Sequence, residues 1–464
     1  MRPLLALVPT ISLLAGCSPA VRLAPMPTVA SGGWSQRDPS GSAEGIASPL
    51  ASLLGDPELA RLTAQAIAGN PDIAAAAARV ERARADLGAA RRASLPEISA
   101  QTGLNAQFGK RGSSGIDYRQ SFAQLDVSWE LDLAGRFAAG RRAARGRLES
   151  AQWARDAVAL AIETEVARAW IQRAALVRRL DIYDRLIARA REMERIVRVR
   201  QDAGTATRVE LGLQSIRVLD LRRQRSEIAQ SLEQTRSALA VLVGAEAPTF
   251  TSDPAEFDRF TLPALVPPAP AALLAARPDV RGAEADIAAA NGDVAAARAS
   301  FFPRLTVSAS GLAANDPLTR TVTLGSGLLA PIFARGTLGR DLQAAGARQV
   351  EAAEVYRRTL LAALAEVETL NATIAGSAER ADLVGAIADE ARTTARLSNL
   401  EYLEGEEDLR FVINAEQLLG EAEEARVLLQ QERLFAQIAL YSAMGGLPSQ
   451  AASARAPNTG RGDR

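Results

Sequence analysis

The chain has 464 residues, no histidine and one cysteine, and its 54 Lys and Arg balance its 54 Asp and Glu. Without histidine the chain lacks the commonest general base and the usual imidazole metal ligand, which argues against a hydrolase or a zinc site. The balanced charge gives no overall field to recruit nucleic acid, and a lone cysteine excludes an intramolecular disulfide. We therefore expect no enzyme activity, no metal, no cofactor and no nucleic-acid partner.

The N-terminus has the pattern of an export signal. Arg2 precedes an apolar run that is too short to span a bilayer. Leu14-Ala15-Gly16-Cys17 is similar to the lipobox of bacterial lipoproteins, whose cysteine is lipidated and becomes the first residue after cleavage, and Ser18 resembles proteins sorted to the outer membrane. The sequence predicts a signal peptide over 1–16 and lipidation of Cys17. The alternative is a chance thiol near an ordinary cleavage site.

The rest of the chain contains two copies of one unit. Asn70-Pro71-Asp72 matches Arg277-Pro278-Asp279, and Leu95-Pro96 matches Phe302-Pro303 at the same offset. A period this long is not that of a solenoid. Segments rich in Pro, Ser or Gly precede, join and follow the copies. The predicted organisation is a lipidated linker over 17–57, copy one over 58–246, a Pro-rich joint over 247–270, copy two over 271–446 and a disordered tail over 447–464.

Each copy contains two stretches in which apolar and polar residues alternate, as in strands with one apolar face. In copy one these are Ile98 to Phe108 and Leu125 to Leu133, with a Gly- and Ser-rich turn at Arg111 to Asp117 between them. Copy two has a weaker pattern of the same kind. The predicted β-hairpins span about 95–133 and about 302–333.

Alternation alone does not distinguish a soluble, half-buried sheet from a sheet that faces lipid. The export signal and the flanking helices favour a membrane sheet with its polar side chains facing a wet lumen. Four strands cannot close a barrel, and hydrocarbon does not tolerate an open edge, so the chain must oligomerise to insert. Bacterial barrels have at least about eight strands, so two subunits would suffice on count and three would give twelve.

A long proline-free helical stretch follows each hairpin, over 135–202 and over 335–403. At 1.5 Å per residue, each would extend about 100 Å. Apolar residues advance by threes and fours along the first, which is the spacing of a coiled-coil seam, and an ordinary coiled-coil dimer is the alternative. Return helices are predicted over 206–243 and 407–444. Their lengths fit the long helices if each stacks end to end with the helix that leads into the hairpin.

The chain resembles the outer-membrane factor family in the order and duplication of its motifs. These are the lipobox, the two Pro-Asp motifs, the two strand entries and the terminal Leu440 to Gly446. The family comprises the TolC-like exit ducts of tripartite pumps, and the resemblance is closest to their lipoprotein branch. It covers almost the whole mature chain. It implies a mainly α fold with long-helix α-barrel and four β-strands per subunit, closed as a trimer with a twelve-stranded barrel and a twelve-helix tunnel.

The same resemblance implies a function and partners. The chain would be a passive duct for small molecules, a lipid-anchored homotrimer in the outer membrane that extends into the periplasm. A periplasmic adaptor and an inner-membrane RND-type transporter would be its partners. The duct of a type I protein-secretion system and a non-channel periplasmic lipoprotein scaffold are the alternatives.

The resemblance also identifies the turns after the long helices as the periplasmic tip. Gly204 and Thr205 in the first turn, and Gly405 and Glu406 in the second, are the expected adaptor contacts. Glycine suits both positions because a helix reversal favours a left-handed residue after the helix end, which is also a sufficient structural reason for it.

The residues after the second turn are candidates for a pore constriction. Three copies of its acidic residues could form a ring of carboxylates, or the acids could simply favour the start of a helix. Related ducts often have aspartates six and nine positions after this glycine, where this chain has Phe411 and Asn414. The candidate constriction residues are Glu407, Asp408, Arg410, Phe411 and Asn414.

Overall fold

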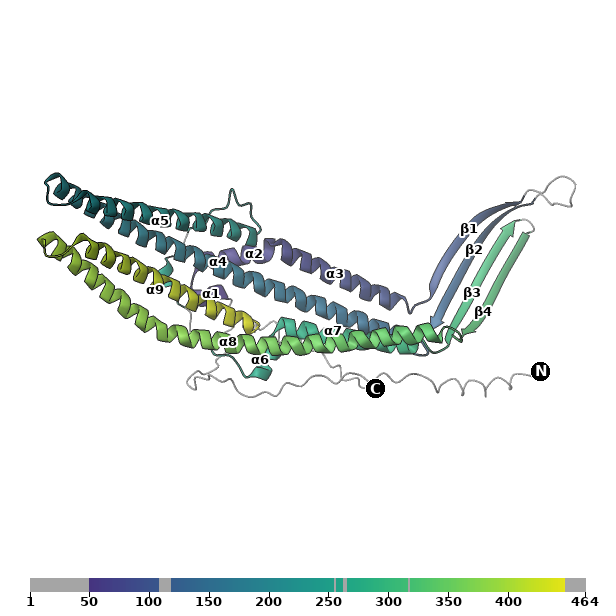
Figure 1. The fold of residues 1–464 in the computed structure, drawn as a ribbon. Coiled ribbons are helices and arrows are strands. Elements are labelled where there is room, and N and C mark those ends of the chain that lie inside the picture. Colours follow the sequence, from purple (N-terminus) through teal and green to yellow (C-terminus); the bar gives the residue numbers. More distant parts are fainter. Residues whose placement is uncertain (1–49, 108–117, 254–255, 262–264, 316–317, 447–464) are drawn as a thin grey trace. The chain divides into compact units, whose positions relative to one another are not determined.

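The computed structural model describes residues 50–107, 118–253, 256–261, 265–315 and 318–446 (Figure 1). The predicted signal peptide, Cys17, most of the linker, the turn at 111–117 and the C-terminal tail lie outside these residues. The elements, in chain order, are α1 Leu50–Leu54, α2 Pro57–Gly69, α3 Pro71–Arg92, β1 Glu97–Gln107, β2 Tyr118–Leu131, α4 Arg136–Asp202, α5 Arg208–Leu242, η1 Phe257–Arg259, α6 Pro270–Ala276, α7 Pro278–Ala299, β3 Arg304–Asn315, β4 Leu318–Leu329, α8 Arg335–Glu404 and α9 Leu409–Ala443. Among these helices, none is both long enough and apolar enough to cross a membrane.

The long helices begin and end within two residues of the predicted spans, α4 with 67 residues and α8 with 70. Two strands begin before the residues at which the alternation of polar and apolar side chains is clearest. β2 begins at Tyr118 and β4 at Leu318. The strands have 11, 14, 12 and 12 residues. A tilted strand needs about 9–11 residues to cross the hydrocarbon of a bilayer.

The chain forms two compact units that do not follow the two sequence copies. One unit contains residues 77–154 and 279–359, and the other contains the described residues up to 76, 155–278 and 360–446. Each unit therefore combines segments of both copies, and the long helices α4 and α8 each contribute to both units.

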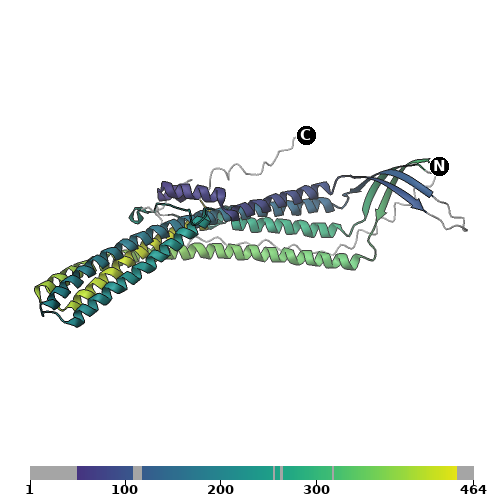
Figure 2. The ribbon, with the colours of Figure 1, turned by 90° about the horizontal axis from the view of Figure 1, so that it is seen from above.

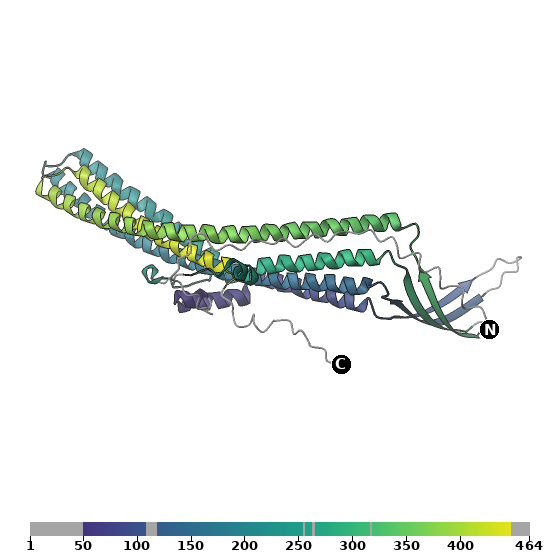
Figure 3. The same cartoon turned by 90° about the horizontal axis from the view of Figure 1, so that it is seen from below.

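The first unit contains an antiparallel sheet of strand order β1-β2-β3-β4 (Figure 3). The register keeps residues of one kind in rows across the strands. One row, which joins polar side chains on all four strands, consists of Ser99, Asp126, Ser310 and Thr323. The next row, on the opposite face, consists of Ile98, Val127, Ala309 and Leu324. The sheet thus has a polar face and an apolar face, and β1 and β4 are its edges.

The end of β2 corrects one detail of the predicted alternation. The pattern extended the strand to Leu133, but β2 ends at Leu131. The carboxylate of Asp132 instead accepts hydrogen bonds from the backbone N–H groups of Phe137 and Ala138, at 3.0 and 2.8 Å. Asp132 satisfies two donors that the first turn of α4 leaves unpaired, so it is part of the strand-to-helix connection.

Small residues allow α4 and α7 to approach closely in the first unit. A Cβ atom on Gly292 would lie 2.5 Å from the backbone nitrogen of Ala143, and one on Gly146 would lie 2.7 Å from that of Ala289. Arg147 and Asp293 form an ion pair beside this contact. Any larger residue at either glycine would push the two backbones apart.

In the second unit, two side chains join helices end to end. Asn70 Nδ2 donates to the carbonyl of Leu242 at the end of α5, while Asn70 Oδ1 accepts from the N–H of Asp72 at the start of α3, at 2.9 and 2.8 Å. In the second copy, Arg277 Nη1 donates to the carbonyl of Ala443 at the end of α9, at 2.9 Å. The first residues of the two duplicated Pro-Asp motifs therefore satisfy helix ends that would otherwise be orphaned.

The main hydrophobic core also lies in the second unit, where α1 and α2 pack on α4. Trp170 is almost fully buried there, and its indole Nε1 donates to Asp56 Oδ2 at 3.1 Å. Glu163 on α4 accepts hydrogen bonds from the N–H of Leu50 at 3.0 Å and from the hydroxyl of Tyr441 at 3.4 Å. Burial raises the pKa of the Glu163 carboxyl, and these two hydrogen bonds oppose the rise.

The position of Glu163 predicts a pH-dependent stability. A carboxyl whose pKa is higher in the folded than in the unfolded chain adds most to the free energy of unfolding below its unfolded pKa. This stabilisation is lost as pH rises through its folded pKa. Glu163→Gln keeps an acceptor for Leu50 and Tyr441 without the charge. The melting temperature of Glu163→Gln, relative to that of the parent, should therefore rise by a few degrees as pH rises from 5 to 7.5.

Thermal unfolding followed by circular dichroism at several pH values measures this effect. Glu165→Gln, which changes an exposed carboxylate on the same helix, is the matched control and should follow the parent. If Glu163→Gln also runs parallel to the parent over this range, the carboxyl of Glu163 does not carry the predicted pH dependence.

Candidate functional site

The two turns at the ends of the long helices have the same geometry. Gly204 has a φ of 75° and Gly405 a φ of 86°, in the left-handed region that glycine adopts without steric cost. The N–H of Thr205 donates to the carbonyl of Arg200 at 2.8 Å, and the N–H of Glu406 donates to that of Glu401 at 2.9 Å. These are the bonds of a Schellman C-cap, so both predicted glycines end a helix as expected.

Arg200 joins the first turn to the second. Its guanidinium donates to the carbonyls of Tyr402 at 3.0 Å and Leu403 at 2.8 Å, in the last turn of α8, and lies 4.5 Å from the centroid of the Tyr402 ring. A cation at a helix C-terminus is favourable because the last carbonyls carry partial negative charge. Arg200 is not among the residues predicted from the sequence. The available signal was an arginine in the last turn before a capping glycine.

A small apolar cluster supports this connection. Its buried members are Met193 and Val197 of α4, Tyr402 of α8, and Leu409 and Val412 of α9. Both helical hairpins contribute to it, α4–α5 and α8–α9. Arg200 and the apolar cluster together hold the two predicted tip turns side by side (Figure 2).

Asp408 has a structural role at the second turn. It is the N-cap of α9, and its side chain accepts from the N–H of Arg410 at 2.9 Å and pairs with the guanidinium of Arg410 at 3.0 Å. The Arg410 side chain, and then its N–H, hold the pKa of the Asp408 carboxyl below its usual value. The alternative of acids that favour a helix start thus has direct support at Asp408, and a carboxylate ring stays a prediction.

Three of the other constriction candidates lie on the exposed side of α9. Arg410, Phe411 and Asn414 are exposed, whereas Leu409 and Val412 are buried. Phe411 is 58% exposed. Glu407 is half-buried. The structure therefore gathers Arg410, Phe411 and Asn414 on one free face next to the second turn.

Above the tip, glutamates of α9 connect α4 with α8. Glu416 accepts from Asn399 of α8 at 2.9 Å and pairs with Arg189 of α4 at 3.7 Å. Glu423 pairs with Arg185 of α4 at 3.6 Å and with Arg392 of α8 at 3.8 Å. α9 thus carries acids that face basic residues on both neighbours.

The next glutamate makes the tightest of these contacts. Glu424 receives a hydrogen bond from Arg179 Nε at 2.8 Å and from the Tyr183 hydroxyl at 2.9 Å. Burial, and then the hydrogen bond to Glu424, raise the pKa of Tyr183 to about 12. The tyrosine therefore stays neutral and remains a donor to Glu424 at any physiological pH.

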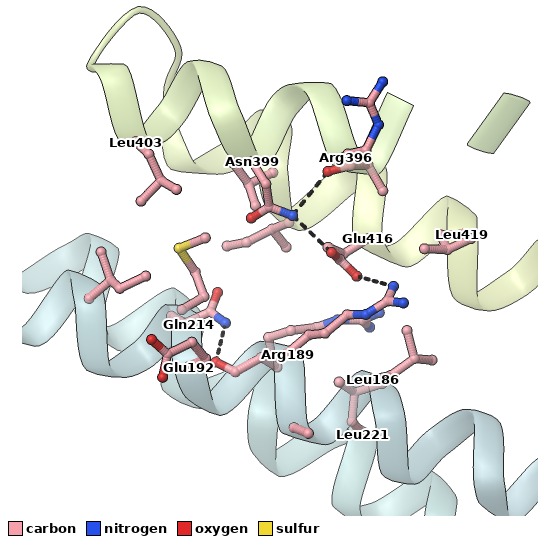
Figure 4. Close-up of a pocket in the computed structure, with 18 of the residues that line it drawn as sticks. Leu186, Arg189, Glu192, Gln214, Leu221, Arg396, Asn399, Leu403, Glu416 and Leu419 are labelled. Carbon is pink, nitrogen blue, oxygen red and sulfur yellow. Dashed lines mark hydrogen bonds and ion pairs between the residues drawn. The ribbon is translucent and has the colours of Figure 1, made fainter. Parts of the chain in front are cut away.

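The two hairpins also line a partly open cavity of about 800 Å³ (Figure 4). Its walls come from all four helices α4, α5, α8 and α9, and they include Gln214, Arg217, Asn399 and Glu416. In the described residues no group of three or more acidic or cysteine side chains is arranged to hold a metal ion.

A family model described as outer membrane efflux protein matches residues 62–245 and 269–446. The pyoverdine export outer membrane protein OpmQ of Pseudomonas aeruginosa is 32% identical over 406 residues, which are 84% of this chain and 86% of that protein. The toluene efflux pump outer membrane protein TtgF of Pseudomonas putida is 28% identical over 404 residues, 84% of each chain.

Among solved structures, the open state of the Neisseria gonorrhoeae MtrE outer membrane channel has the same fold. It superposes with a TM-score of 0.82 at 24% identity, over 93% of this chain and 99% of that chain. The family model matches twice, once in each of the two predicted copies. The mainly helical fold with four strands is that of outer-membrane channels, as the sequence predicted, and the chain belongs to the outer membrane efflux protein family.

Proposed function

We propose that the chain is the passive exit duct of a tripartite pump, closed as a homotrimer and fed by a periplasmic adaptor and an inner-membrane RND-type transporter. The observation that carries this proposal is the sheet, with one apolar face that is exposed and two edge strands, β1 and β4, that each pair on one side only among the described strands. Lipid would cover the apolar face, and strands of neighbouring subunits would pair with the edges. Three subunits with four strands each would give a twelve-stranded barrel.

Exposed apolar residues on the helices support assembly as well. Along α5 they are Val209, Leu213, Ile216 and Leu219. Along α8 they include Leu383, Ile387, Leu397 and Leu400. Apolar rows of this extent are unusual on a solvated monomer and favour contact with further subunits or the adaptor.

Relatives at similar identity are named for pyoverdine export and for toluene efflux. Two such different compounds favour a duct that does not select its cargo. Opening would occur at the tip, where Gly204, Thr205, Gly405 and Glu406 are the proposed adaptor contacts. Glu407, Asp408, Arg410, Phe411 and Asn414 remain the proposed constriction.

The two faces of β4 provide a matched test of membrane insertion. Leu324 and Thr323 are neighbours on opposite faces, and both are exposed in the single chain. Leu324→Arg should prevent insertion, because an arginine on a lipid-facing strand costs about 2–4 kcal/mol at mid-membrane, whereas Thr323→Arg should insert normally. Outer-membrane fractionation and conductance in planar bilayers measure the two outcomes.

Light scattering of the parent in detergent should give the mass of three subunits. A water-soluble, non-conducting parent, or equal tolerance of both arginines, would instead favour the periplasmic scaffold.

Arg200 provides a test of tip opening. Arg200→Gln removes charge-assisted hydrogen bonds to the carbonyls of Tyr402 and Leu403, each of a class that contributes about 1.5–3 kcal/mol. We expect the open probability of single channels to rise by about tenfold or more. Arg198→Gln is the control, because Arg198 is exposed and, among the described residues, pairs only with Glu194 on its own helix, at 3.0 Å. An equal open probability of the two variants would contradict a role of Arg200 in closure.

Lipid anchoring at Cys17 is also part of the proposal, and it rests on the lipobox Leu14-Ala15-Gly16-Cys17. Cys17→Ser should abolish incorporation of labelled palmitate in a Gram-negative host and leave the precursor uncleaved, while Ser18→Ala should be labelled as the parent is. Labelling of Cys17→Ser would show that the lipid is attached elsewhere. An unlabelled parent would favour the duct of a type I secretion system, which usually lacks the anchor.

A further inference from the structure

The cavity between the hairpins has the size and walls of a ligand site. Its volume of about 800 Å³ lies in the range of about 300–1,000 Å³ that small-molecule sites occupy. Apolar side chains of both hairpins line it, among them Leu186, Met193 and Leu221 from the first, and Leu400, Ile413 and Leu419 from the second. All of these residues belong to one compact unit.

One buried polar group in the wall lacks a partner. Gln214 of α5 is only 3% exposed, and its amide nitrogen donates to the carbonyl of Ala190 at 2.8 Å. Its amide oxygen is buried and accepts no hydrogen bond from any residue that the structure describes. In Figure 4 the amide nitrogen faces α4, and the opposite end of the amide is turned toward the space between the hairpins. A buried acceptor without a donor loses its hydrogen bond to water and so lowers the free energy of unfolding. A hydrogen-bond donor inside the cavity would remove this cost.

The charges of the wall are unbalanced in favour of cations. The carboxylate of Glu416 is engaged by Arg189 and Asn399. Glu192 pairs with Arg195, which does not line the cavity, through hydrogen bonds of 3.0 and 2.5 Å. Arg217 is half-buried, and in the described part of the chain it forms neither an ion pair nor a hydrogen bond. A half-buried guanidinium without such a partner favours an anion nearby.

Gln214 and Arg217 are three residues apart on one helix, so they are neighbours on the same face, with Cβ atoms about 5–6 Å apart. We propose that this cavity binds an amphiphilic organic carboxylate that carries an N–H or O–H donor. The carboxylate pairs with Arg217, the donor bonds the amide oxygen of Gln214, and the apolar body contacts the leucine, methionine and isoleucine walls.

The proposed ligand would touch both hairpins at once. A ligand that binds the folded arrangement and not the unfolded chain raises the melting temperature in proportion to its occupancy. The binding does not depend on the proposed export function, because it requires only the geometry of α4, α5, α8 and α9. A failure of channel activity would therefore leave this proposal untouched, and a failure of binding would leave the channel untouched.

The test uses the purified full chain in detergent and indole-3-propionate, which has a carboxylate, an indole N–H and an apolar ring. Isothermal titration calorimetry against a detergent blank should detect saturable binding. The 1-methyl derivative, which lacks the N–H, and the propionamide, which lacks the charge, should each bind about tenfold more weakly or worse.

Three variants locate the site. Gln214→Met and Arg217→Gln should each weaken binding of indole-3-propionate about tenfold or more. Arg396→Gln is the matched control, because Arg396 belongs to the same wall but its exposed guanidinium points away from the cavity in Figure 4. Its affinity should equal that of the parent.

Three outcomes would overturn the proposal. The first is the absence of saturable heat, which would mean that water alone occupies the cavity. The others are equal binding of the methylated and parent probes, and an unchanged affinity in Arg217→Gln. If Gln214→Met unfolds, as judged by circular dichroism, Arg217→Gln decides, because a half-buried arginine without an ion pair is tolerant of replacement.

Discussion

The structure depends on a sheet that a single chain cannot complete. Its register collects polar side chains such as Asp126 and Ser310 on one face and apolar ones such as Val127 and Leu324 on the other. The pairing of β2 with β3 joins the two copies inside the chain, and the same join between β4 and the β1 of a neighbour is what closure requires. Because an unpaired edge is not tolerated in hydrocarbon, the proposed duct would insert into the membrane only as it assembles.

Duplication supplied two similar hairpins, and divergence in charge made them complementary. Glu423 and Glu424 of α9 correspond to Arg222 and Arg223 of α5, at the offset that matches Gly204 with Gly405. The acids of α9 face Arg179, Arg185 and Arg189 of α4. An α9 identical to α5 would place arginines opposite the arginines of α4 at the positions of Glu423 and Glu424. The charges therefore favour the pairing of one α4–α5 hairpin with one α8–α9 hairpin over the pairing of two identical hairpins.

Periodicity in the sequence was sufficient for the elements and their order, because alternation and the three-and-four spacing are local consequences of strand and helix geometry. The match between the two copies and the family resemblance identified Gly204 and Gly405, whose backbone conformation depends only on their own turns. Periodicity could not assign Arg200 to the carbonyls of Tyr402 and Leu403, or Asn70 to the end of α5, because these partners are far away in sequence. For Asp132 the local pattern itself was misleading, and it predicted a strand. Its neighbours alternate, but its carboxylate is used by the next helix.

The contacts between the hairpins loosen from the core toward the tip, and this gradient determines where motion can begin. Glu424 is held by Arg179 at 2.8 Å and by Tyr183, whereas Glu423 and Glu416 lie 3.6 and 3.7 Å from their arginines on α4. Those arginines are also more exposed than Arg179, so solvent screens their pairs more strongly. Beyond them only Arg200 and a small apolar cluster connect the turns among the described contacts. Separation of the hairpins therefore requires least work at the turns and most at the core, where Trp170 is buried.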